Sequence, residues 1–241
     1  MLHATKGIVL RTVKYSETSI IVSIYTELYG LQSYLINGVR TEKKSSVKAN
    51  MYQPTTMLDL IVYHNPHKNL QRIKDVKLFY TKNFQGADVI KYTIGIYMVE
   101  LIQKAITETE TNTELYDFFE ESFLHVLNEK EIALSNFPVA FTLQFAEHLG
   151  FSIQNNYTEH SPLFNLQDGN FIAENDSIIA FRVDKEDSYI ISEILKGSDI
   201  HLQMTGAKRL EILNICIQYL RLHIPHLGEL KSVPVLHEIL N

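Results

Sequence analysis

The sequence predicts an α+β protein in which a small five-stranded barrel is followed by a mainly α-helical domain. Short runs rich in β-branched residues dominate the first 80 residues, and helical periodicity begins near residue 84. The formal charge changes sign at the same place, from +6 over residues 1–80 to −12 over residues 81–241. We therefore expect two domains, 1–80 and 81–241, the second with a small irregular or β insertion.

The expected strands alternate between apolar and polar residues or are apolar throughout, as half-buried strands do. They cover residues 6–13, 19–26, 31–37, 57–63 and 70–80. Tyr29-Gly30 suits a tight hairpin turn, and Asn65-Pro66 favours another. Five closely spaced strands with one longer link match a Greek-key barrel of the OB type, whose face and loops commonly bind oligonucleotides; an SH3-like barrel would give a similar pattern.

Three amphipathic helices are expected next. Their apolar faces carry Ile90, Ile94, Tyr97, Leu101 and Ala105, then Leu115, Phe118, Phe119, Phe123 and Val126, and finally Phe137, Ala140, Phe141, Phe145 and Leu149. Ser135 is the expected N-cap of the third helix and Gly150 its stop.

The insertion is expected over residues 151–181, with Asp168-Gly169 as a hairpin turn between two short strands. A short helix is expected over residues 188–196. Thr205 can cap a longer helix that Pro225 ends after Ile224. This last helix is apolar over most of its girth, which predicts a central, buried element.

Composition favours a cytoplasmic protein without an active site. The longest apolar run, residues 20–25, is too short to span a bilayer, and the N-terminus lacks a signal-peptide core. Cys216 is the single cysteine, and it fits an inert core thiol. The pairs His64 and His67, and His223 and His226, offer too few ligands for a metal. No phosphate-cradling loop or catalytic constellation is present, so we expect no enzyme, cofactor or metal.

The basic segment, residues 38–48, carries four cations against one carboxylate. Such a loop can be a solvated connection or a contact for an anionic partner. Further cations of the first domain are interleaved with tyrosines, which pairs backbone-binding charge with rings able to stack on bases or to pack in the barrel core. The candidate DNA-binding residues are Lys6, Arg11, Lys14, Tyr15, Arg40, Lys43, Lys44, Lys48, Lys68 and Arg72.

Through the order and spacing of several short motifs, the chain resembles the RecO family of bacterial DNA repair and recombination mediators. The motifs are KGIVLR at residues 6–11 with YSE at 15–17, YT at 25–26 before Gly30, NGVR at 37–40 before the lysines and SS at 45–46, QP at 53–54, LDL at 58–60, LKS at 230–232 and VLHEIL at 235–240. They span nearly the whole chain.

The resemblance implies an OB-fold followed by a helical domain, with no catalytic turnover. It implies binding to single- and double-stranded DNA, annealing of complementary strands, and loading of the recombinase RecA onto gaps coated by single-strand-binding protein. The implied partners are RecR and the C-terminal tail of single-strand-binding protein, and the implied location is the cytoplasm, associated with the nucleoid. Arg40, Lys43 and Lys44 are the positions carried over as DNA contacts.

One departure from the family concerns zinc. Many members hold a structural zinc with four cysteines after the third helix, whereas residues 151–181 contain none. Packing of Phe164, Leu166, Phe171 and Ile172 is expected to stabilise this segment instead. The alternative function is a protein-interaction scaffold whose basic barrel binds an acidic peptide.

Overall fold

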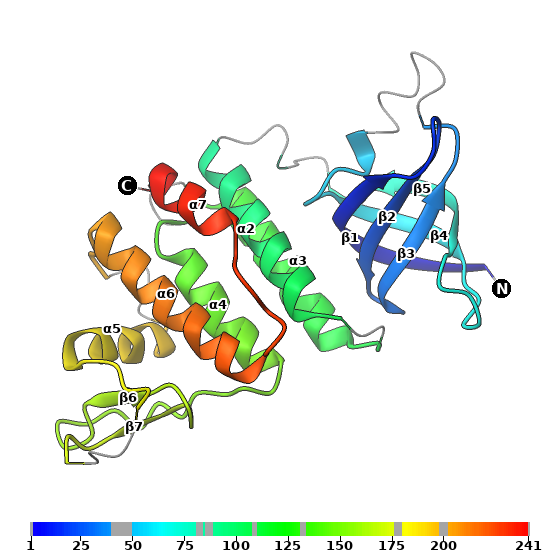
Figure 1. Ribbon diagram of the computed structural model, residues 1–241. Helices are drawn as coiled ribbons and strands as arrows, with labels where there is room; N and C mark the ends of the chain where they lie inside the picture. The colour runs from blue at the N-terminus through cyan, green and yellow to red at the C-terminus, as the bar shows by residue number, and fades with distance from the viewer. Residues whose placement is uncertain are drawn as a thin grey trace. The chain divides into compact units, whose positions relative to one another are not determined.

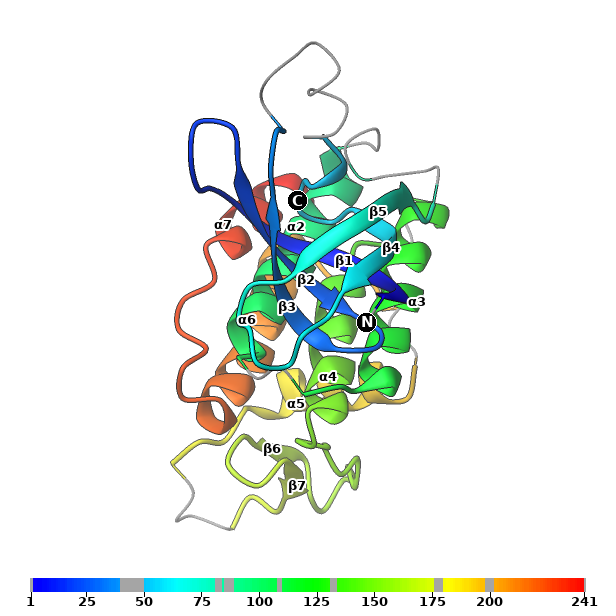
Figure 2. The ribbon, with the colours of Figure 1, turned by 90° about the vertical axis from the view of Figure 1, so that its right-hand side faces the viewer.

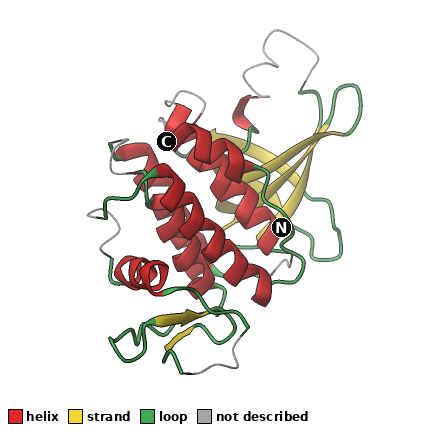
Figure 3. Ribbon diagram, turned by 60° about the vertical axis from the view of Figure 1, so that its left-hand side comes forward, coloured by secondary structure: helices red, strands yellow, loops and turns green. Residues whose placement is uncertain are grey.

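The computed structural model describes residues 2–39, 50–80, 84, 89–107, 110–130, 134–175, 180–197 and 202–240. Its residues group into two units, Met1–Asn128 and Glu129–Asn241. The first unit contains the five-stranded sheet and two helices, and the second contains four helices and a two-stranded hairpin among its described residues. The α+β class predicted from the sequence is confirmed, and the strands form two separate groups (Figure 3).

The N-terminal sheet is antiparallel and is built around its first strand. The strands are β1 (Leu2–Lys14), β2 (Ile20–Thr26), β3 (Gly30–Ile36), β4 (Met57–Tyr63) and β5 (Arg72–Leu78), in the order β3-β2-β1-β4-β5 (Figure 1). The first half of β1 pairs with β4 and the second half with β2, and the register shifts at Leu10. Because a bulge bends and twists a strand, β1 can serve both neighbours.

The two edge strands meet and close the sheet. Tyr34 in β3 forms a parallel bridge with Gln71, the residue before β5. The Gln71 N–H donates to the Ser33 carbonyl at 2.8 Å, and the Leu35 N–H donates to the Gln71 carbonyl at 3.0 Å. A five-stranded antiparallel sheet whose third and fifth strands meet in parallel is an arrangement of the OB type.

The barrel interior is apolar and close-packed. Its buried residues are Val9, Ile20, Val22, Ile24, Tyr34, Val39, Tyr52, Leu58, Leu60 and Val62. Gly7 lies where a side chain has no room, because a Cβ there would be 2.5 Å from the Ile24 Cγ2 atom. At Gly30, φ is +57°, which is the left-handed value that the predicted hairpin turn between β2 and β3 needs.

Two helices of the first unit pack against each other and against β1. They are α2 (Val89–Ala105) and α3 (Thr113–Asn128). The Asn112 carboxamide oxygen caps α3 by accepting from the Leu115 N–H at 2.9 Å. The Tyr25 ring meets Phe119 edge to face, with 5.2 Å between ring centroids. The outer side of the barrel at Tyr25 is therefore covered by α3.

The second unit surrounds one central helix. Its elements are α4 (Phe137–His148), β6 (Leu163–Asn165), β7 (Asn170–Ile172), α5 (Lys185–Leu195), α6 (Gly206–His223) and α7 (Ser232–Leu240). Helix α6 contacts α4, α5 and α7 and buries six side chains, among them Cys216. The prediction of a central, buried helix is confirmed.

The capping residues predicted from the sequence are correct for one helix and wrong for another. The Thr205 cap of α6 is confirmed, since its hydroxyl accepts from the Lys208 N–H. Ser135 was the wrong cap for α4: the N-cap is Asn136, whose side chain makes no cap bond. It accepts instead from the Arg209 Nε and donates to the Leu202 carbonyl. Helix α5 begins at Lys185, earlier than expected, because Asp184 caps it.

An ion cluster with one buried member, Asp187, joins α5 to α6. Asp187 is 2% exposed, and its carboxylate accepts from the Lys208 Nζ at 2.7 Å. Lys208 also lies 2.9 Å from Glu211. Burial raises the pKa of Asp187, while the Lys208 ammonium acts to lower it. Lys208 therefore offsets part of the cost of burying the Asp187 carboxylate.

Removing that cation should destabilise the protein. We expect Lys208→Met to reduce the free energy of unfolding by about 3 kcal/mol, because it leaves a buried carboxylate unpaired. The loss should be smaller at pH 5 than at pH 8, since protonation relieves the unpaired charge. Urea denaturation at both pH values measures this. Lys185→Met, which removes an ion pair with both side chains more than half exposed, is the matched control and should change stability by less than about 1 kcal/mol.

The closing contact of the barrel gives a second stability prediction. Gln71 is 3% exposed, and its side chain bonds the backbone of the β4–β5 loop. We expect Gln71→Leu to cost about 2 kcal/mol, because the loop's polar groups lose their partners. The exposed Gln53→Leu should leave the urea midpoint within experimental error. Equal midpoints for the two variants would contradict the role given to Gln71.

Candidate nucleic-acid interface

Five of the predicted DNA-binding residues lie on exposed parts of the barrel at two places. Arg11 and Lys14 are near the end of β1, and Tyr15 follows in the β1–β2 loop with 62% of its surface exposed. Lys68 lies in the β4–β5 loop, and Arg72 is the first residue of β5. All five are exposed.

The strand register relates these two places to each other. Arg11 pairs with Ser23, which pairs with Ser33, whose carbonyl accepts from the Gln71 N–H. Neighbouring strands are about 4.8 Å apart, so this row crosses three spacings, roughly 14 Å. The outer surface of β2 and β3, which we call the β2–β3 face, is thus flanked by cations on both sides.

The loops at the ends of the β2–β3 face are those that OB-type barrels use for ligands. Ile20 pairs with Ile36, so the β1–β2 loop lies at one end of the face. Tyr29, at the other end, stacks on His64 of the β4–β5 loop. Figure 2 shows the β1–β2 loop in blue and the β4–β5 loop in cyan at these two ends.

The residues on either side of the basic segment are attached near the β1–β2 loop. The Val39 N–H donates to the Thr18 carbonyl at 2.9 Å, and the Ser19 hydroxyl bonds the Asn37 side chain at 3.1 Å. On the other side, the Thr12 hydroxyl donates to the Tyr52 carbonyl. Arg40, Lys43, Lys44 and Lys48 lie outside the described residues. The chain nevertheless enters and leaves that segment beside the loop that carries Tyr15.

Lys6 lies on another surface and already has a partner. Its Nζ bonds both carboxylate oxygens of Glu120 in α3, at 2.9 and 3.1 Å, and lies 4.3 Å from the centre of the Phe79 ring. The hydrogen bond to Glu120 raises the pKa of Lys6. A DNA contact at Lys6 stays a prediction, but the structure gives this ammonium a role in joining β1 to α3.

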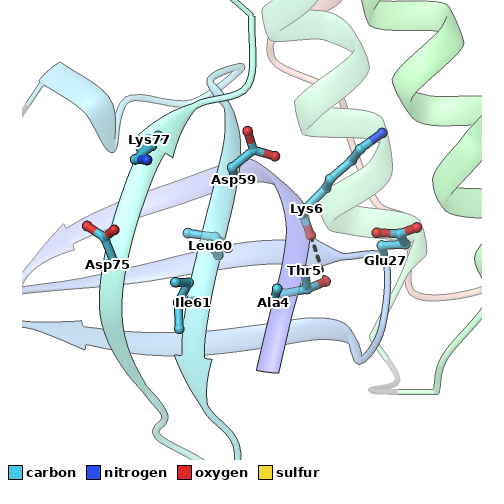
Figure 4. Close-up of a pocket in the computed structure, with 9 residues that line it drawn as sticks. All are labelled: Ala4, Thr5, Lys6, Glu27, Asp59, Leu60, Ile61, Asp75 and Lys77. Atoms are coloured by element: carbon cyan, nitrogen blue, oxygen red, sulfur yellow. Dashed lines mark hydrogen bonds between the residues drawn. The ribbon is translucent and has the colours of Figure 1, made fainter. Parts of the chain in front are cut away.

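The surface of β1, β4 and β5 around Lys6 is poorly suited to a polyanion. A hollow of about 400 Å³ there has three carboxylates, Glu27, Asp59 and Asp75, against two lysines, Lys6 and Lys77. Figure 4 shows Lys6 pointing away from the strand, with Asp59 and Glu27 on either side of it. Carboxylates repel phosphates, so the β2–β3 face is the better candidate.

The tyrosines divide between core and surface. Tyr25 and Tyr34 are 1% and 0% exposed: Tyr34 packs in the barrel core, and Tyr25 lies on the outer side of the barrel under α3. Burial raises the pKa of Tyr25 to about 12. Tyr15 and Tyr63 are 62% and 49% exposed and can meet a base.

Sequence reasoning missed one aromatic pair. The rings of Tyr29 and His64 stack with centroids 3.8 Å apart and planes 9° from parallel. From the sequence, His64 was interpreted as an exposed loop histidine with too few companions to hold a metal. No local signal joins two residues so far apart in the chain; the closure between β3 and β5 brings them together.

Comparison with known proteins agrees with this architecture. A family model described as recombination protein O, N terminal, matches residues 1–81, and one described as recombination protein O, C terminal, matches residues 86–160. The chain belongs to the RecO family. It is 32% identical to the DNA repair protein RecO of Christiangramia forsetii and 32% identical to that of Phocaeicola vulgatus, in both cases over 99% of each chain. The RecO of Flavobacterium psychrophilum is also 32% identical, over 98% of each chain.

Within this RecO-family chain, the segment without zinc cysteines is held by packing. Phe164, Leu166 and Phe171 are at most 3% exposed, as the sequence predicted, whereas Ile172 is only partly buried. Asn156 adds two bonds to the backbone of Phe171. Among the described residues, no group of three or more His, Cys, Asp and Glu side chains is placed to hold a metal ion. None of the described helices is long and apolar enough to cross a membrane.

Lys6 gives a test that separates structure from binding. We expect Lys6→Met to lower the free energy of unfolding by about 1 kcal/mol, because Glu120 loses a half-buried partner. The raised pKa of Lys6 means that this contribution is complete below about pH 10, the unfolded pKa, and is lost as the pH rises through the folded pKa. Chemical denaturation at pH 7 measures it. The exposed Lys77→Met is the control, and an equal loss there would contradict the assignment.

Proposed function

We propose that this chain is a non-enzymatic mediator of DNA repair and recombination. It binds single- and double-stranded DNA, anneals complementary strands, and helps load a recombinase onto gaps coated by single-strand-binding protein. Membership of a family whose relatives are named DNA repair proteins supports this at the level of the process. DNA binding and annealing rest on the geometry of the barrel, and recombinase loading rests on the family resemblance.

One observation carries the DNA-binding part of the proposal. Cations flank the β2–β3 face on both sides, Arg11 and Lys14 at the end of β1 and Lys68 and Arg72 beside β5. The basic segment starts and ends next to the β1–β2 loop of the same barrel. A strand lying across this face would meet positive charge along its backbone.

Such a surface suits annealing. Lysine and arginine side chains that contact phosphates fix a strand without reading its sequence. The base edges of the strand stay available for pairing, and neutralised phosphates reduce the repulsion between two strands. The barrel therefore needs no active site to speed annealing.

The remainder of the chain has a different charge and a different proposed role. Residues 81–241 carry −12, so they do not favour a polyanion. We assign partner contacts to this domain, with RecR and the C-terminal tail of single-strand-binding protein as partners and RecA as the indirect one. Binding of DNA by residues 1–80 and of partners by residues 81–241 would place the protein at the nucleoid.

Removal of the described cations tests the DNA-binding face. The triple variant Arg11→Ala, Lys14→Ala and Arg72→Ala should weaken binding to all single strands alike, because these residues contact phosphates. The log-log dependence of affinity on salt should become shallower by about 0.7 for each lost contact, about 2 in total. Fluorescence anisotropy across a salt series measures both effects.

The control removes the same charge elsewhere. Lys185→Ala, Lys196→Ala and Lys231→Ala should leave the salt dependence close to that of the wild type, since these lysines lie in the second unit. If both triple variants weaken binding equally, net charge rather than the face governs binding. A further variant with Arg40, Lys43 and Lys44 changed to Ala tests the basic segment itself.

Annealing is the assay that decides the mediator role. The protein should accelerate pairing of complementary strands that are already covered by single-strand-binding protein. A chain that binds DNA but leaves this rate unchanged would be a DNA-binding protein and not a mediator.

A further inference from the structure

A polar hollow of about 480 Å³ lies at the β4–β5 end of the β2–β3 face. Its walls come from the β2–β3 turn, β3, the β4–β5 loop, and Thr107 and Thr111 between α2 and α3. The residues that matter for its chemistry are Tyr29, Gln32, Ser33, His64, Lys68 and Thr111. Its volume falls within the range of about 300–1,000 Å³ that small-molecule sites occupy.

A stacked pair of rings forms one wall. His64 lies flat against Tyr29 at 3.8 Å, and His3 meets Tyr29 edge to face at 5.7 Å. Among the described residues, Tyr29 alone stacks on His64. The opposite face of the imidazole therefore has no described ring against it. Burial is the main cause that lowers the pKa of His64, which favours the neutral imidazole. A neutral imidazole can stack on a nucleobase.

Polar groups are arranged around this ring pair. The Gln32 side chain donates to the Tyr29 carbonyl at 2.8 Å, which fixes the amide at the wall of the hollow. The buried Nδ1 of His64 has no hydrogen-bond partner within the described part of the chain. Lys68 supplies a cation at the same wall. Amide and hydroxyl groups, a ring and one cation are the groups that bind a base and its phosphate.

The loop that carries His64 and Lys68 is fixed before any ligand arrives. The Gln71 side chain donates to the Asn65 carbonyl at 2.9 Å and to the Lys68 carbonyl at 2.5 Å, and it accepts from the Asn65 N–H at 2.9 Å. On the opposite wall, the Thr111 hydroxyl donates to the Leu28 carbonyl at 3.0 Å. A preformed site loses less entropy when it binds.

We propose that this hollow receives one unstacked base of a bound single strand, with the base on the face of His64 turned away from Tyr29 and a neighbouring phosphate at Lys68. The proposal rests on the proposed function, since it requires a strand on the β2–β3 face. It adds that the face holds bases as well as backbone at this end. The barrel would then distinguish a strand with bases from a backbone of equal charge.

Two strands of equal length and charge test the proposal with the full-length protein: oligothymidylate and a wholly abasic strand. The wild type should bind oligothymidylate more tightly than the abasic strand, by about five-fold or more, because stacking on a ring favours bases. His64→Ala should lower this preference by about five-fold or more while it leaves affinity for the abasic strand unchanged. Lys68→Ala should weaken binding to both strands alike.

Two further variants separate stacking from loss of structure. His67→Ala is the matched control, because His67 is exposed on the same loop and does not line the hollow; it should keep the preference. His64→Phe restores a ring and should recover the preference. If His64→Ala keeps the preference, or His64→Phe fails to recover it, stacking in this hollow is overturned while DNA binding stands. If the wild type binds neither strand, the proposed function itself fails.

Discussion

The first unit depends on the side chain and backbone of Gln71. Its backbone pairs with β3 and closes the sheet, and its side chain holds the β4–β5 loop. One buried residue therefore both closes the barrel and holds the loop beside β3. A polar residue is tolerated at 3% exposure because its amide group makes three hydrogen bonds.

The outer surface of the barrel is divided among three uses. Helices α2 and α3 cover one side, where Tyr25 meets Phe119 and Lys6 pairs with Glu120. The surface of β1, β4 and β5 carries mixed charges. The β2–β3 face has cations at both flanks and a ring pair at one end. Because of this charge and coverage, we propose this face as the surface for a nucleic acid, although the protein as a whole carries −6.

The sequence predicted what is encoded locally. Strand alternation, the Gly30 and Gly169 turns and the Thr205 cap all depend on neighbouring residues, and each is present. Contacts between residues far apart in the sequence could not be predicted: Lys6 and Glu120, which form an ion pair, are 114 residues apart. The cap of α4 was misplaced because Ser135 and Asn136 both have cap-forming side chains, and packing against α6 decides between them. The resemblance to the RecO family supplied the function, which no local pattern specifies.

The way the chain enters and leaves residues 40–49 has an evolutionary consequence. Val39 and Tyr52 are both attached to the region of Thr12 and Thr18, so the two stems are fixed by the barrel alone. The entropy of closing a loop rises only slowly with its length, by about 0.6 kcal/mol for each doubling. Relatives could therefore gain or lose lysines and arginines between these stems without a change in the fold of the domain. Such changes would alter the proposed affinity for a polyanion.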